Sequence, residues 1–369
     1  LQLARGYQNS PQPVPVYFSL SAPTGSGKTV IAASVIETLM FGSDAYPHAA
    51  DPKASVLWIS DSPSLNQQSL YRIESASEKL TGRSVMIETN FAGENFDPRK
   101  IYFINTQKLR EGGILARDNR FAHHESQGIL MPRPDSGGLS FYEILQNTIN
   151  DTEVNLYVII DEAHRGIAKN QVSNHTTILN KIISGRDNQD KPVPIVMGIS
   201  ATIKRFEEAM AGTKRFPLES VGVNTEDVQK SGHNKDTGRI GIPDEAENFD
   251  MALIGYGAKA TREQSQQWVE YHETQLSMGG VVESDVVLPL LVVQLPNEPD
   301  DALLTDVIRT ILEHWPELDP DQAFAQVFGE HQDLAPGGFN LPYIEPQRVQ
   351  DSRHIRVLMA MTAVTPGWD

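Results

Sequence analysis

Short apolar runs alternate with longer amphipathic stretches along the first 200 residues of the chain. Each run is too short for a helix and apolar enough for a strand that is covered on both faces. The runs lie at 16–20, 56–60, 100–105, 156–160 and 194–200. Apolar spacing between the runs predicts helices at 30–40, 65–80 and 176–184. This alternation predicts an α/β fold in which helices flank a mostly parallel sheet.

The pattern changes after residue 216, where the chain is polar and rich in turn residues up to position 250. Beyond it, helices are predicted at 258–276, 302–315 and 321–328. Residues 286–295 are strand-like, although Pro289 indicates an edge position or a break. A last apolar run covers 356–361. A chain of 369 residues is long for one core, so two or three domains are expected.

A glycine-rich segment, APTGSGKT at 22–29, joins the first predicted strand to the first predicted helix. Strand, Gly-rich turn and helix are the context that a phosphate-binding loop requires. Gly25 and Gly27 permit backbone conformations that a side chain would block, so the N–H groups of the turn can converge on phosphate oxygens. Ala22 stands where the usual pattern has glycine. The alternative is an ordinary turn between a strand and a helix.

The phosphate-loop interpretation assigns a role to individual side chains. Lys28 would place a positive charge on the β- and γ-phosphates, and Thr29 a hydroxyl on Mg²⁺. The loop residues expected to hold the nucleotide are Pro23, Thr24, Gly25, Ser26, Gly27, Lys28 and Thr29.

An acidic pair follows the predicted strand at 156–160, within the sequence Asp161-Glu162-Ala163-His164. Asp161 can hold Mg²⁺ beside the phosphates, and Glu162 can activate the attacking water as a general base. His164 could sense the γ-phosphate or contact a neighbouring domain. The alternative is a solvated helix cap, since acidic residues favour helix N-termini. The phosphate loop makes the catalytic interpretation the stronger one.

Small hydroxyl residues, Ser200 and Thr202, close the next predicted strand. They can bond to the acidic motif or to His164, and such a bond could pass the state of the nucleotide to a neighbouring surface. The tripeptide Ser-Ala-Thr is common, so its significance comes from its place after the acidic strand.

Composition excludes several classes of site. The chain has no cysteine, which rules out disulfides, iron–sulfur clusters and thiolate zinc sites and fits the cytoplasm. No apolar run approaches the length of a membrane span. The net charge of −17 argues against a protein that coats DNA along its whole surface, but allows a local basic groove.

The ordered set APTGSGKT, DEAH and SAT resembles helicase superfamily 2, in its first RecA-like domain, over about residues 1–215. The resemblance implies that Lys28 and Thr29 grip the phosphates, while Asp161 binds Mg²⁺ and Glu162 activates water. It also implies that His164, Ser200 and Thr202 couple hydrolysis to movement along a strand.

Flanking sequences resemble the helicase subunit of type III restriction enzymes and related phage-defence helicases. These sequences are DEAHRG at 161–166, INTQKL at 104–109, QKSG at 229–232, LVVQLPN at 291–297 and MTAVTPGWD at 361–369. The last matches the family's fifth motif at Gly367, Trp368 and Asp369, with Pro366 in place of glutamate, and Gly367 and Asp369 are expected at the nucleotide. No arginine-rich sixth motif follows, so the segment by itself is expected to bind ATP and hydrolyse it poorly.

The resemblance implies two RecA-like domains, the second incomplete. The expected boundaries are 1–225 for the first domain, 226–285 for a linker with a helical insertion, and 286–369 for the second domain. The expected activity is an ATP-dependent helicase or translocase, with ATP and Mg²⁺ as cofactors, acting on DNA in restriction or phage defence. Nuclease or methyltransferase subunits are possible partners, and a membrane is not. Alternatives are an RNA-processing DEAH helicase and a nucleotide-gated DNA-binding scaffold without translocation.

A few further residues invite a functional interpretation. Lys108 and Arg110 are equally compatible with phosphate contacts and with ordinary surface charge. Trp268 and Tyr271 are expected to pack in a core or between domains rather than to stack on bases, and Trp315 and Trp368 are expected to pack. His123 and His124 are expected to be solvated rather than metal ligands.

Overall fold

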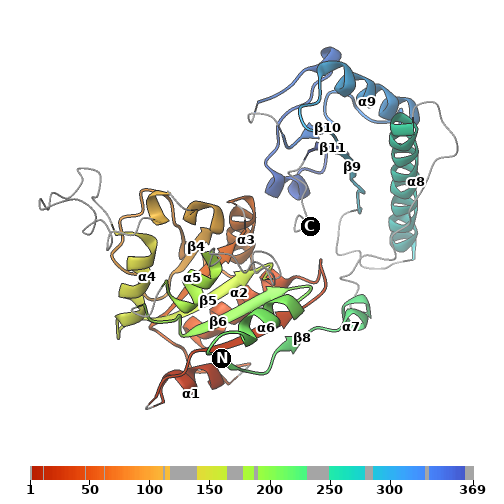
Figure 1. Cartoon of the computed structure of the whole chain (residues 1–369). Helices are drawn as coiled ribbons and strands as arrows, with labels where there is room; N and C mark the ends of the chain where they lie inside the picture. Colours follow the sequence, from red (N-terminus) through yellow and green to blue (C-terminus); the bar gives the residue numbers. More distant parts are fainter. Residues whose placement is uncertain are drawn as a thin grey trace, which may run out of the picture. The chain divides into compact units, whose positions relative to one another are not determined.

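The computed structural model describes residues 2–10, 12–45, 47–61, 63–110, 113–116, 139–163, 178–186, 190–230, 249–278, 286–328 and 332–361. Contacts divide the chain into two compact units, residues 1–236 and residues 237–368 (Figure 1). Among the described residues, none of the helices combines the length and the apolar character that crossing a membrane requires.

The first unit is built on a parallel sheet whose strand order is β3-β4-β2-β5-β6-β1-β7, with β8 also paired to β1. The strands are β1 (Val16–Ser21), β2 (Ala54–Ser60), β3 (Ser84–Met86), β4 (Ile101–Asn105), β5 (Asn155–Asp161), β6 (Ile195–Ser200), β7 (Phe216–Pro217) and β8 (Val221–Gly222). All five predicted strands are present, so the predicted α/β class with a mostly parallel sheet is confirmed.

Helices cover both faces of this sheet (Figure 1). The helices of this unit are α1 (Gln2–Gln8), α2 (Lys28–Phe41), α3 (Pro63–Ala76), α4 (Phe141–Asn150), α5 (Ile178–Ser184), α6 (Lys204–Ala211) and α7 (Thr225–Lys230), with 3₁₀ turns η1 (Thr106–Leu109) and η2 (Ile114–Ala116). Successive residues of a strand point to opposite faces. Accordingly, Leu57 and Ile59 of β2 join one apolar cluster, whereas Val56 and Trp58 join the other.

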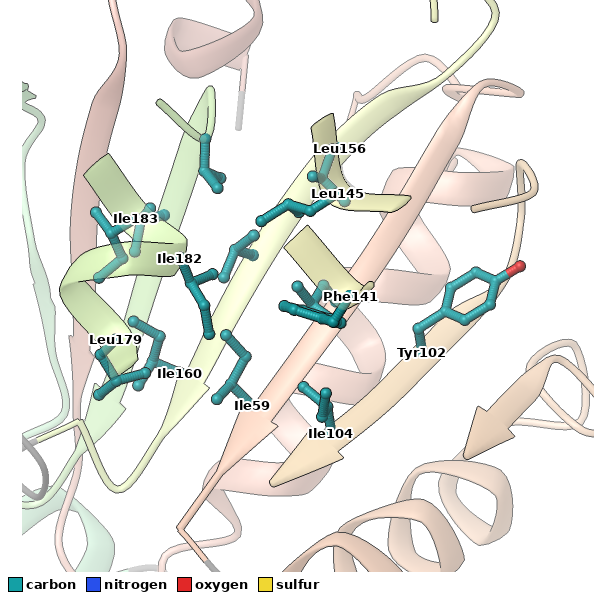
Figure 2. Close-up of a cluster of buried hydrophobic side chains, with 14 of the residues drawn as sticks. Ile59, Tyr102, Ile104, Phe141, Leu145, Leu156, Ile160, Leu179, Ile182 and Ile183 are labelled. Carbon is teal, nitrogen blue, oxygen red and sulfur yellow. The ribbon is translucent and has the colours of Figure 1, made fainter. Parts of the chain in front are cut away.

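Figure 2 shows the cluster on the face that α4 and α5 cover. Phe141 and Leu145 from α4 lie over the sheet, with Leu145 next to Leu156, and Ile182 and Ile183 are contributed by α5. The cluster on the opposite face takes its helical residues from α1, α2 and α3, such as Ala4, Ile36 and Ile73. Burial on both faces explains why the strand runs are apolar throughout instead of alternating.

The second unit contains a smaller parallel sheet of order β10-β11-β9. Its elements are α8 (Phe249–Ser277), β9 (Leu291–Gln294), α9 (Asp301–His314), β10 (Phe324–Gln326), η3 (Pro336–Gly338), η4 (Pro346–Asp351) and β11 (Val357–Ala360). Helix α9 buries Val307, Ile308 and Ile311 against this sheet. Helix α8 approaches α9 closely at Gly255, where an added Cβ would lie 2.7 Å from the His314 ring.

The prediction of a helix at 321–328 is wrong, because residues 324–326 form strand β10. Phe324 faces one apolar cluster and Ala325 the other, which is the two-sided burial of a strand. The strand predicted at 286–295 is confined to β9, which begins two residues after Pro289. The helix predicted at 258–276 begins earlier, at Phe249, and its Ala258 belongs to the core of the second unit.

Candidate functional site

Strand order brings the glycine-rich loop and the acidic pair to one edge of the first sheet. Strand β6 pairs with β1 on one side and with β5 on the other. At the carboxyl ends, Ser200 is in register with Ser21, and Ile199 is in register with Asp161. Neighbouring strands lie about 4.8 Å apart, so the ends of β1 and β5 are separated by about 10 Å. In parallel sheets, ligands bind at this edge.

The loop at 22–27 has the backbone conformation that its glycines predict. Gly25 and Gly27 have φ angles of 79° and 77°, in the left-handed region that side chains disfavour. The Ser26 amide and hydroxyl both donate to the Pro23 carbonyl, at 3.2 and 2.6 Å. Ala22 is 1% exposed, so the methyl group that replaces the usual glycine hydrogen is accommodated in the protein interior.

Lys28 and Thr29 form the first turn of α2, directly after Gly27. The ammonium group of Lys28 donates to the Pro23 carbonyl at 3.3 Å, so it lies across its own loop. Both side chains are partly exposed, and Thr24 and Gly25 are exposed. Lys28 and Thr29 therefore stand at a helix N-terminus, which is where anions bind.

The carboxylate of Asp161, at the end of β5, is held by two donors. The Ser69 hydroxyl of α3 donates to Oδ2 at 3.1 Å, and the Glu162 amide donates to Oδ1 at 3.0 Å. Burial raises the pKa of Asp161 to about 6, and the negative charge of Glu162 adds to this effect. The donors and the positive charge of Lys28 lower the same pKa, so Lys28 lies close enough to act on Asp161.

Glu162 has a φ of 48°, which is rare for a residue with a side chain. Such a conformation costs on the order of 1–3 kcal/mol and is found mainly where the surrounding structure imposes it, often at functional sites. Asp161 and Glu162 line a small cavity together with Asp61 and Thr106, which follow the ends of β2 and β4. Thr106 donates to Asp61 at 3.4 Å. The strained glutamate thus faces polar groups from two further strand ends.

Strand β6 links the two motifs through Ser200. This residue is fully buried, its carbonyl accepts from the Ala22 amide at 3.3 Å, and its hydroxyl accepts from the Thr202 amide at 3.1 Å. One residue earlier, the Ile199 carbonyl accepts from the Ala163 amide at 3.0 Å. The Ser-Ala-Thr strand is therefore in backbone contact with both the glycine-rich loop and the acidic motif.

The described residues contain no cluster of three or more His, Cys, Asp or Glu side chains that could hold a metal. Mg²⁺ does not require such a cluster, because proteins usually bind it through one or two carboxylates together with waters and substrate phosphates. Asp161 and Thr29 supply oxygen donors of that kind. The predicted metal-binding residues thus have suitable chemistry for Mg²⁺ bound to a nucleotide.

Several predicted residues lie outside the described part of the chain: His123, His124, His164, Gly367, Trp368 and Asp369. Lys108 forms an ion pair with Glu88 and donates to the Ile87 carbonyl at 3.2 Å, whereas Arg110 is exposed.

The aromatic residues that were expected to pack differ in their exposure to solvent. Trp268 and Tyr271 are 42% and 57% exposed, so neither packs in a core, since this part of α8 has few buried residues. The alternative, packing between domains, stays a prediction. Trp315 is 4% exposed, as predicted.

Ser69 is a site residue that sequence reasoning missed. It lies in the middle of α3, and nothing in its local pattern distinguishes it from a surface serine. The sequence carries no local signal for it, because its bond to Asp161 joins segments that are 92 positions apart.

The chain matches a known protein family. Residues 15–205, more than half of the chain, match the family described as "Type III restriction enzyme, res subunit". None of the curated protein sequences matches the chain. Among solved structures, UvsW of T4 is 12% identical, covers 95% of this chain and 55% of its own, and has a TM-score of 0.31. The helicase domain of Hef from Pyrococcus furiosus is 13% identical, covers 83% of this chain and 52% of its own, and has a TM-score of 0.30. The chain thus spans about half the length of each of these structures.

Proposed function

The chain belongs to the family of the type III restriction enzyme res subunit, and from this premise we propose that it is an ATP-dependent nucleic-acid translocase that acts on DNA. Its role would be in restriction or phage defence. The observation that carries the proposal is the order β5-β6-β1, which puts Asp161 and Lys28 at one edge of the sheet with Ser200 between them.

The proposed reaction is attack of water on the γ-phosphate of ATP. Lys28 and the loop amides would hold the phosphates and stabilise the charge that develops on them. Glu162 would accept the proton of the attacking water. Asp161 and Thr29 would hold Mg²⁺, which neutralises phosphate charge when bound. The site residues named from the sequence, His164, Gly367 and Asp369 included, remain part of this proposal.

Coupling would run through β6. Its backbone bonds to the Ala22 amide and to the Ala163 amide, so a shift of the phosphate loop or of the acidic motif bears directly on Ser200 and Thr202. Repeated cycles of hydrolysis would then move the protein along one strand of nucleic acid. The proposed domain boundaries remain 1–225, 226–285 and 286–369.

Steady-state ATP hydrolysis tests the proposal in its simplest form. Lys28→Ala should abolish even the low turnover that is expected of this segment by itself. It should leave the circular dichroism spectrum unchanged, because within the described part of the chain the partly exposed side chain donates a hydrogen bond only to its own loop. Lys204→Ala is the matched control, since Lys204 is exposed and also opens a helix. Normal turnover by Lys28→Ala would refute the proposed site.

The kind of nucleic acid on which the protein acts is tested by measuring ATP hydrolysis with duplex DNA, single-stranded DNA and RNA. Stimulation by DNA alone is expected. Stronger stimulation by RNA would favour an RNA-processing helicase. Displacement of a triplex-forming oligonucleotide from duplex DNA separates a translocase from a nucleotide-gated scaffold, which would bind DNA and ATP without displacing the third strand.

A further inference from the structure

A groove of about 770 Å³ lies in the second unit, away from the carboxyl ends of its strands. It is lined by Ala323 and Arg356, which immediately precede β10 and β11, by Leu288, which lies shortly before β9, and by Val269 of α8. Nucleotides bind at the opposite, carboxyl edge of parallel sheets. The groove is therefore separate from any nucleotide site of that kind, and its volume lies in the range of small-molecule pockets, about 300–1,000 Å³.

Arg356 is a fixed cation in the wall of this groove. Its guanidinium group lies 5.0 Å from the centre of the buried Trp315 ring. Its Nη2 donates to the Ser265 hydroxyl at 2.7 Å and to the Pro289 carbonyl at 3.4 Å. The aromatic ring and these two acceptors hold the guanidinium group in one orientation, so a ligand would meet a preorganised donor.

Arg356 lies in no ion pair within the described part of the chain, although carboxylates line the same groove. Its buried Nε has no hydrogen-bond partner among the described residues. Arg262, which lines the same groove, differs because it is paired with Glu317. Burial lowers the pKa of Arg356, which reflects the cost of holding a partly desolvated cation. An anion in the groove would offset that cost.

The rest of the lining determines what kind of anion fits. Val269, Leu288 and Leu318 supply apolar surface next to the guanidinium group. Three carboxylates also line the groove: Glu317, which is paired with Arg262, and Glu270 and Asp319, whose negative charge opposes a polyanion such as a nucleic-acid backbone. A ligand with one negative charge needs one cation only, and its apolar part gains from the apolar wall.

We propose that this groove binds an apolar molecule that carries a single carboxylate. The carboxylate would pair with Arg356, and the apolar group would lie against Trp315, Leu288 and Leu318. Two sources have this chemistry: a small carboxylic acid, and the C-terminal residue of a peptide. The proposal does not depend on the activity of the first unit.

A matched pair of probes tests the charge requirement on the full chain. Binding of 3-phenylpropionate and of its neutral amide is followed by the nuclear magnetic resonance signals of the tryptophan indole N–H groups, with Trp315 assigned by Trp315→Phe. The acid should shift the Trp315 signal and bind at least tenfold more tightly than the amide, because charge-assisted hydrogen bonds are the stronger ones. Equal binding of acid and amide, or no shift at millimolar acid, would overturn the proposal.

Substitution tests the same point from the protein side. Arg356→Gln should weaken binding of the acid about 10- to 100-fold and leave the amide unaffected. Arg309→Gln is the matched control, since Arg309 is exposed on α9 outside the groove lining, and it should bind the acid like the original chain. If Arg356→Gln does not fold, Ser265→Ala releases the guanidinium group from its hydrogen bond and should weaken acid binding too. Unchanged affinity in the folded variant would contradict the assignment.

A comparison with peptides distinguishes the two sources of the carboxylate. A pentapeptide that ends in phenylalanine is compared in its free-acid and amidated forms. Tighter binding of the free-acid peptide than of 3-phenylpropionate identifies a peptide end as the ligand, and weaker binding identifies a small acid. Equal binding of the free-acid and amidated peptides would refute the carboxylate requirement.

Discussion

Replacing Asp161 by asparagine should make the protein more stable at pH 8 while abolishing ATP hydrolysis. The carboxylate is held between the Ser69 hydroxyl and the Glu162 amide. Asparagine has nearly the same shape, and its carbonyl oxygen can still accept from the Glu162 amide. The substitution therefore removes a buried charge and little else.

The expected gain follows from the pKa of Asp161, which burial and then Glu162 raise from 3.8 to about 6. A carboxyl group with a raised pKa in the folded state contributes stability that is fully present below pH 4 and is lost as the pH rises through 6. A shift of about two units corresponds to about 3 kcal/mol. At pH 8 the original protein carries this whole penalty and Asp161→Asn carries none, whereas below pH 4 neither does.

Urea denaturation followed by circular dichroism measures this difference, without ATP or Mg²⁺, at pH 4 and pH 8. The free energy of unfolding of Asp161→Asn minus that of the original protein should be larger at pH 8 than at pH 4 by up to about 3 kcal/mol. Carboxylates elsewhere titrate in both proteins and cancel in this comparison. Asp306→Asn, an exposed position on α9, should change stability by less than about 0.5 kcal/mol. A gain for Asp161→Asn that is no larger at pH 8 than at pH 4 would refute the reasoning.

Other substitutions test the contacts around the site and the sheet. Ser69→Ala should shift the acidic limb of the profile of kcat/KM against pH to higher pH, because it removes a hydrogen-bond donor that lowers the pKa of Asp161. An unshifted limb would mean that this hydrogen bond does not lower the pKa of Asp161 in solution. Gly198→Ala should lower the free energy of unfolding by about 1–3 kcal/mol, since an added Cβ would lie 2.7 Å from the Phe206 ring. Gly212→Ala, whose added Cβ has its nearest contact at 3.4 Å, should change the free energy of unfolding by less than about 0.5 kcal/mol. Equal effects of the two substitutions would show that the strand and α6 can separate freely. Asp51→Ala should destabilise the protein by about 3–5 kcal/mol in urea denaturation, because Arg5 and the buried Tyr157 hydroxyl lose their partner. In the original protein Arg5 pairs with Asp51 at 3.1 Å, and the Tyr157 hydroxyl donates to Asp51 at 2.9 Å. A loss of stability below about 1 kcal/mol would argue against this buried network.

Some features of the second unit were not accessible to pattern reasoning. The apolar residues at 323–328 are compatible with a helix or a strand, and pairing of β10 with β11 decides between them. The aromatic pair on α8 has the spacing of a packing stripe, yet Trp268 and Tyr271 are exposed, because the core of the second unit covers earlier residues of that helix such as Ala258.

The sequence by itself determined the central strands of the first sheet, the conformation of the glycine-rich loop and the candidate catalytic residues. These depend on local properties: continuous apolar runs, glycines at two positions and polar residues directly after a strand. Only the tertiary structure decided that β6 lies between β1 and β5, that Ser69 holds Asp161 from 92 positions away, and that Arg356 faces a groove without a carboxylate partner among the described residues. The physical reason is that strand pairing, burial and charge compensation are contacts between distant segments, which the pattern of any one segment does not specify.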